Sequence, residues 1–97
     1  MAVTVYIPTP FRRATANRDR IDVSAPDVAG LLDELERAYG GLKGLVRNDR
    51  GEVHQHVAIY VNSEPIDGLS GLATSLADGD EVAIIPALAG GASVAPR

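Results

Sequence analysis

The sequence has no cysteine and no tryptophan, and one phenylalanine among its 97 residues. Without cysteine the chain can form neither a disulfide nor a thiolate metal site, and it cannot use a cysteine nucleophile. Because large aromatic side chains are so few, the core has to be aliphatic. A chain of this length is sufficient for one folded unit but not for two independent cores.

Basic residues are also in the minority. Nine Lys and Arg against thirteen Asp and Glu give a net charge of −4. Binding to nucleic acid or to an anionic membrane surface depends on clustered Lys and Arg, so we expect neither partner. We interpret the one local cluster of arginines as a solvated loop rather than a site for an anionic partner; it comprises Arg12, Arg13, Arg18 and Arg20.

Long apolar runs are absent as well. No segment approaches the roughly 18 apolar residues that a membrane-spanning helix needs, and the amino terminus lacks the pattern of a signal peptide. We therefore expect a location in the cytoplasm. The apolar content of 45% against 23% charged residues is typical of a folded globular chain.

Alternation of apolar and polar residues predicts strands. Residues 1–7 form the first strand, and residues 21–23 are close enough to pair with it as a hairpin. Residues 56–62 show the clearest alternation, and we expect them to form a central strand. A turn-rich segment with a short strand follows, and we expect Leu69, Leu72 and Leu76 to be buried there. The tight turn at residues 78–80 then leads into a last strand over residues 81–86.

One amphipathic helix is predicted after Ser24. We expect the Ser24 hydroxyl to cap the helix, with Pro26 and Asp27 in its first turn. Gly40 and Gly41 are expected to end it as a left-handed carboxyl-terminal cap. Apolar residues recur at helical spacing on one face only: Val28, Leu31, Leu32 and Leu35.

This order of elements predicts an α+β fold. A mixed sheet of four to five strands would carry one main helix on one face and leave the other face open. We assign residues 1–86 to this unit. Residues 87–97 are small, glycine-rich and without helical or strand periodicity, which predicts a flexible tail.

Residue patterns typical of catalysis are weak. His54 and His56 share one side of a strand and could bind one metal ion, but no acid or cysteine completes the set, so we predict surface histidines and no metal site. Asp78 and Asp80 could act as an acid–base pair, but turn formation accounts for both. The chain has no serine-hydrolase elbow and no phosphate-binding loop. No catalytic residue is predicted.

The end of the chain carries a more specific pattern. LADGDEVAIIPALAGG, residues 76–91, joins an acidic turn, an apolar strand, a proline and a diglycine. Together with VTVYIPTPFRR from Val3 and HVAIYVNSEPI from His56, it resembles the ubiquitin-like sulfur-carrier family of the ThiS and MoaD type, and especially its CysO-like branch. The resemblance covers residues 1–91 and implies a β-grasp fold, in agreement with the predicted sheet and helix.

The resemblance implies a carrier and not an enzyme, with no bound cofactor. In the family, a partner similar to ubiquitin-activating enzymes adenylates the terminal glycine from ATP, and the resulting thiocarboxylate donates sulfur to a biosynthetic enzyme. On this chain the activated residue would be Gly91, next to Gly90. The pathway stays open between cysteine, thiamin, molybdopterin and secondary-metabolite synthesis.

Six residues, 92–97, follow Gly91, whereas members of the family usually end at the second glycine. A glycine inside a peptide bond cannot become a thiocarboxylate. We therefore expect residues 92–97 to be a segment that a zinc-dependent JAMM-type metalloprotease removes; the alternative is that they are not native to the protein.

We expect the open face of the sheet to dock partner proteins. The alternative is a set of ordinary exposed apolar side chains. Two other functions also fit the sequence: a protein modifier that forms isopeptide bonds through Gly91, and a β-grasp interaction module that does not use its diglycine. The docking residues predicted on the face and in the tail are His56, Ala58, Tyr60, Ala83, Ile85 and Leu88.

Overall fold

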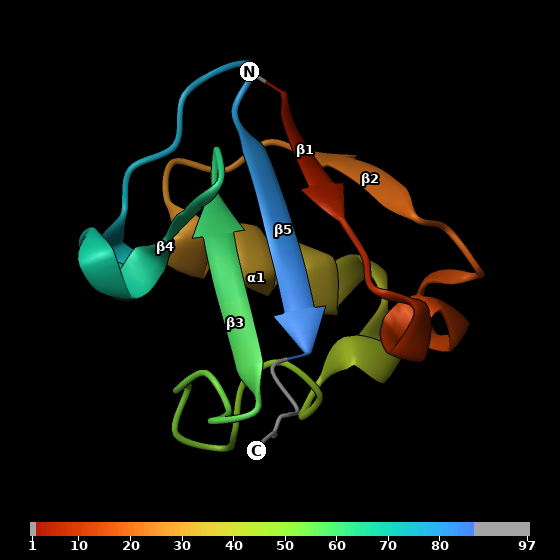
Figure 1. The fold of residues 1–97 in the computed structure, drawn as a ribbon. Helices are drawn as coiled ribbons and strands as arrows, with labels where there is room; N and C mark the ends of the chain where they lie inside the picture. The colour runs from red at the N-terminus through yellow and green to blue at the C-terminus, as the bar shows by residue number, and fades with distance from the viewer. Residues whose placement is uncertain (1, 87–97) are drawn as a thin grey trace, which may run out of the picture.

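Five strands form one mixed sheet in the order β2-β1-β5-β3-β4 (Figure 1). The computed structural model describes residues 2–86, so the predicted flexible tail lies outside the described residues. Helix α1 (Val28–Ala38) crosses one face of the sheet (Figure 1). The strands are β1 (Val3–Tyr6), β2 (Arg20–Val23), β3 (Val57–Val61), β4 (Glu64–Pro65) and β5 (Glu81–Pro86).

The central strand is β5. It pairs in parallel with β1 on one side and antiparallel with β3 on the other. The prediction that residues 56–62 form a central strand is confirmed, since β3 lies inside the sheet between β5 and β4, one place from the centre. Alternating burial appears on any strand with one buried face, so the sequence pattern cannot rank strands by their position in the sheet.

The first two strands form the predicted hairpin, with Val3 opposite Val23. The arginine-containing loop between them includes a 3₁₀ helix, η1 (Thr9–Thr15). Its Phe11 is only 9% exposed and packs into the core. Arg12 also contributes to the structure, because its Nε donates a hydrogen bond to the carbonyl of Ile7 at 3.1 Å.

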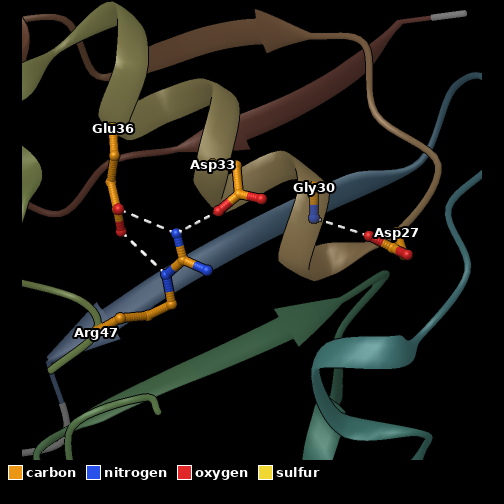
Figure 2. Close-up of polar contacts among 5 residues, drawn as sticks. All are labelled: Asp27, Gly30, Asp33, Glu36 and Arg47. Carbon is orange, nitrogen blue, oxygen red and sulfur yellow. Dashed lines mark hydrogen bonds and ion pairs between the residues drawn. The ribbon is translucent and has the colours of Figure 1, made fainter. Parts of the chain in front are cut away.

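Helix α1 begins after Asp27 and not after Ser24. The carboxylate of Asp27 accepts a hydrogen bond from the backbone N–H of Gly30 at 2.7 Å (Figure 2). Ser24 and Asp27 are both good capping residues, and the predicted cap at Ser24 is wrong because the helix starts only at Val28, directly after Asp27. The predicted apolar stripe is confirmed, since four residues of α1 are buried: Val28, Leu31, Leu32 and Leu35.

The helix ends without the left-handed glycine that we expected. Tyr39 follows it with a φ of −131°, and residues Gly40–Leu42 continue as a short 3₁₀ helix, η2. Gly40 and Gly41 have no positive φ, whereas Gly44 has a φ of +83°. The glycines thus do mark the end of the helix, but the left-handed turn occurs at Gly44.

The loop after η2 is fixed to the outer side of α1 by Arg47. Its Nη2 lies 2.7 Å from Oδ1 of Asp33 and its Nε lies 3.0 Å from Oε2 of Glu36 (Figure 2). Only 13% of the Arg47 side chain is exposed. Hydrogen bonding to Glu36 raises the pKa of the Arg47 guanidinium, and the bond to Asp33 adds to this effect, so the group stays charged in its half-buried position.

The core between the sheet and α1 is aliphatic, as predicted. In the turn-rich segment we expected Leu69, Leu72 and Leu76 to be buried. Leu76 is buried and Leu72 partly so, but Leu69 is 40% exposed and Ile66 is buried instead. Within residues 2–86, no helix is long and apolar enough to cross a membrane.

The acidic turn before β5 joins three parts of the chain. Asp78 Oδ1 accepts a hydrogen bond from the N–H of Ala2 at 2.7 Å. Asp80 accepts hydrogen bonds from the N–H of Ala77 at 2.8 Å and the side-chain amide of Asn62 at 3.0 Å. The bond from Asn62 and then that from Ala77 lower the pKa of the Asp80 carboxyl. Turn formation thus accounts for both carboxylates, as predicted.

Replacing the cap tests its contribution to stability. Asp27→Ala should lower the free energy of unfolding by about 1 kcal/mol, because the N–H of Gly30 loses its acceptor. Asp27→Asn keeps a side-chain oxygen and is the matched control. Denaturant unfolding of both variants measures the difference, and equal stability of the two would contradict the assignment.

The lowered pKa of Asp80 predicts a pH dependence. A carboxyl with a lower pKa in the folded state stabilises the fold above its unfolded-state pKa of about 3.9, and this contribution is lost as the pH falls through the folded-state pKa. Asp80→Asn should therefore destabilise the protein at neutral pH and approach the wild type in strong acid. The control is Asp67→Asn, at an exposed site. A stability difference for Asp80→Asn that does not change with pH would refute the prediction.

Candidate functional site

The face of the sheet opposite α1 carries no helix in the described part of the chain (Figure 1). Along β5, Val82 and Ile84 are buried against α1, whereas Ala83 is half-buried and Ile85 is 43% exposed. β1 and β3 alternate in the same way. The sheet therefore has one face in the core and one face open, as predicted.

Two tyrosines flank a small residue in the middle of the open face. The register places Ala83 of β5 beside Tyr6 of β1 and Tyr60 of β3. An alanine between two rings leaves space above its methyl group. A depression of ≈ 420 Å³ occupies this place, and it is lined by Tyr6, Tyr60, Ser63, Glu81, Ala83 and Ile85.

This depression has the character of an anchor site. Its floor is the methyl group of Ala83 and its sides are tyrosine rings, while Glu81 and Ser63 supply polar groups. Protein interfaces commonly place a single apolar side chain of the partner in such a depression, surrounded by polar contacts. The shape and lining of the depression are thus compatible with recognition of a protein.

Four of the predicted docking residues lie on this face. Tyr60 and Ala83 line the depression, and Ala58 and Ile85 are neighbours across β3 and β5. His56 lies directly before β3 and is exposed. The sixth predicted residue, Leu88, lies outside the described residues, as do the predicted activation residues Gly90 and Gly91.

The prediction from the sequence missed Tyr6. The alternation of the first strand places Tyr6 on the open face, but only the parallel pairing of β1 with β5 shows that it lies beside Ala83. That pairing joins segments more than seventy residues apart, and no short-range pattern in the sequence reports it.

The two histidines stack on each other. The ring centroids of His54 and His56 lie 5.1 Å apart, and Nε2 of His54 lies 2.8 Å from the carbonyl oxygen of Gly44. Within residues 2–86, no three or more His, Asp or Glu side chains are grouped so that they could hold a metal ion. The contact to Gly44 gives His54 a role in holding the loop before β3.

Strand β5 is the last element in the described part of the chain. Pro86 is the last residue of the strand and lies opposite Val57. The strand that contributes Ala83 and Ile85 to the open face is therefore the strand that leads to Gly90 and Gly91. Four residues separate Pro86 from Gly91 in the sequence.

Known proteins resemble this chain over almost its full length. The model of the ThiS family matches residues 5–91. The sulfur carrier protein CysO of Mycobacterium tuberculosis is 40% identical over 93 residues, covering 94% of this chain and 100% of that protein. A chain in the crystal structure of the Amycolatopsis orientalis BexX/CysO complex has a TM-score of 0.85 at 33% identity, with 93% of this chain and 100% of that chain covered.

A second kind of relative has a different name. Small archaeal modifier protein 3 of Haloferax volcanii is 43% identical over 72 residues, covering 74% of this chain and 76% of that protein. The resemblance to the solved structures confirms the predicted β-grasp fold. From the match over residues 5–91 and the similarity to CysO, the chain belongs to the ThiS family of ubiquitin-like sulfur-carrier proteins.

Proposed function

We propose that this protein is a sulfur carrier and that Gly91 carries the sulfur after residues 92–97 have been removed. The observation that supports this most directly is the extent of the family match, which ends at Gly91. The six residues beyond it lie outside the matched segment. We further propose that a JAMM-type metalloprotease removes them, because only a free glycine carboxylate can be activated.

The proposed chemistry takes place on a partner. A carboxylate is a poor electrophile, so the partner first transfers AMP from ATP to the carboxylate of Gly91 and releases pyrophosphate. A sulfur nucleophile then displaces AMP, which leaves a thiocarboxylate. The carrier supplies the reacting glycine and the docking surface but no catalytic side chain.

We propose the open face as the surface that recognises this adenylyltransferase. The depression between Tyr6 and Tyr60 would hold one apolar side chain of the partner, and Ala58, Ile85 and Leu88 would extend the contact toward the tail. Because Gly90 and Gly91 have no Cβ, they can enter a channel too narrow for other residues. Contacts on the sheet would offset the entropy lost when the tail is ordered.

A sulfur-accepting biosynthetic enzyme would be the second partner. The similar CysO of Amycolatopsis orientalis was crystallised in a complex with BexX, which supports the idea that a chain of this shape binds other proteins. The pocket of that enzyme determines which compound accepts the sulfur.

A protein modifier is the second candidate function. It is favoured by the 43% identity to small archaeal modifier protein 3. In that case the activated Gly91 would form isopeptide bonds with lysines of other proteins. Slower-migrating conjugates that contain this chain would support a modifier, whereas a carrier alone forms none.

Activation should depend on the free carboxylate of Gly91. A chain that ends at Gly91 should support ATP–pyrophosphate exchange by a ubiquitin-activating-like adenylyltransferase, and the chain through Arg97 should not. A chain ending at Gly90 is the matched control and should be inactive. Equal exchange with Arg97 still attached would contradict the proposal.

A charge in the depression should block docking. In a chain ending at Gly91, Ala83→Asp is expected to reduce the rate of ATP–pyrophosphate exchange about tenfold when the carrier is below its saturating concentration. The reason is that the new carboxylate would be buried against the partner's apolar side chain. Ala73→Asp makes the same change at an exposed residue of a 3₁₀ helix away from this face and should have no effect. Unchanged exchange with Ala83→Asp would exclude the depression as the docking site.

A further inference from the structure

The outer edge of β3 is covered along only part of its length. β4 is two residues long and pairs with Tyr60 and Val61. The chain then turns into a 3₁₀ helix, η3 (Ile66–Gly68), and leaves the sheet. Within the described residues, the first part of β3, residues 57–59, therefore has a strand partner on its β5 side only.

The register shows which backbone groups this edge presents. The N–H of Asn62 donates to the carbonyl of Glu81 at 2.8 Å. In an antiparallel ladder alternate residues bond to the same neighbour, so Tyr60 and Ala58 also point toward β5. Val57 and Ile59 then point to the outer edge. The N–H of Val57 is used within the chain, because it donates to the carbonyl of His54 at 3.0 Å.

A groove of ≈ 530 Å³ runs along this edge. Its apolar lining includes Val53, Ile59, Pro65, Ile66 and Leu72. Ile59 and Ile66 are buried, whereas Val53 and Leu72 are only partly covered. The groove thus combines unpaired strand backbone with side-chain contacts, which together are what an added strand requires.

The charges around the groove are of one sign. Glu52 and Asp67 contribute to its lining, and no Lys or Arg is among the described residues that line it. Neither carboxylate forms an ion pair within residues 2–86. A basic segment would therefore find complementary charge here, while an acidic one would be repelled.

We propose that this edge of β3 binds an extended segment of another protein as an additional strand. The segment would have apolar side chains at alternate positions and Lys or Arg at its ends. Its backbone would pair with the N–H of Ile59 and with the carbonyl of Val57. This site lies at the edge of the sheet and shares no lining residue with the depression around Ala83, although Ala58 borders both the groove and the docking surface proposed above.

A short peptide provides the test. The acetylated and amidated peptide KVTVTVK is added to the isotopically labelled full chain, and amide shifts and hydrogen exchange are followed by NMR. We expect shifts to centre on the groove and exchange at the N–H of Ile59 to slow about tenfold, since that group gains an acceptor. The same peptide with every internal amide N-methylated should not bind.

Charge reversal gives a matched pair of variants. Asp67→Lys should weaken peptide binding about threefold. Asp19→Lys makes the same change at an exposed site between β1 and β2 and should leave the affinity unchanged. Peptide EVTVTVE should bind more weakly than KVTVTVK to the wild type.

Four results would overturn the proposal. The first is a set of shifts centred on Tyr6, Ala83 and Ile85, and the second is equal binding of the N-methylated peptide. The third is slow hydrogen exchange at the N–H of Ile59 before peptide is added, because it would mean that the chain or a second copy already covers the edge. The fourth is no shift at millimolar peptide. None of these four measurements involves Gly91, so none of the results would argue against the proposed sulfur-carrier function.

Discussion

Burial of one face of the sheet against α1 is the interaction on which the rest of the structure depends. The chain has no disulfide to support its fold, so alternate aliphatic residues of β1, β3 and β5 and one stripe of α1 must supply the stabilisation. A single helix can cover only one face. The structure therefore gains its stability on one side and keeps the other side available for recognition.

Strand β5 connects the fold to the proposed function. It is paired on both sides, its Val82 and Ile84 are buried, and its Ala83 and Ile85 lie on the open face. The same strand leads to the diglycine. A partner that contacts Ala83 would thus lie only a few residues along the chain from the glycine that we propose it activates.

Local patterns predicted the elements of this fold well. The alternation around Val5 and Ile59 and the helical spacing of Leu31, Leu32 and Leu35 each result from one buried face, which a sequence shows directly. The cap was misplaced because Ser24 and Asp27 have equal capping ability, and only the path of the chain shows that Asp27 meets the N–H of Gly30.

Long-range features were harder to predict. Three features depend on which strands pair: the identity of the strand at the centre of the sheet, the position of Tyr6 beside Ala83, and the half-covered edge of β3. Strand pairing is decided by the whole core. The diglycine was recognised through its family resemblance, because two glycines inside a peptide chain have no distinguishing chemistry.

The central claim is that Gly91 becomes the terminal residue and carries sulfur. The most direct test is the intact mass of this protein purified from the cells that make it, compared with the masses expected for chains ending at Gly91 and at Arg97. The account predicts a species that ends at Gly91, part of which has sulfur in place of one oxygen. A population that retains Arg97 and contains no sulfur would contradict it.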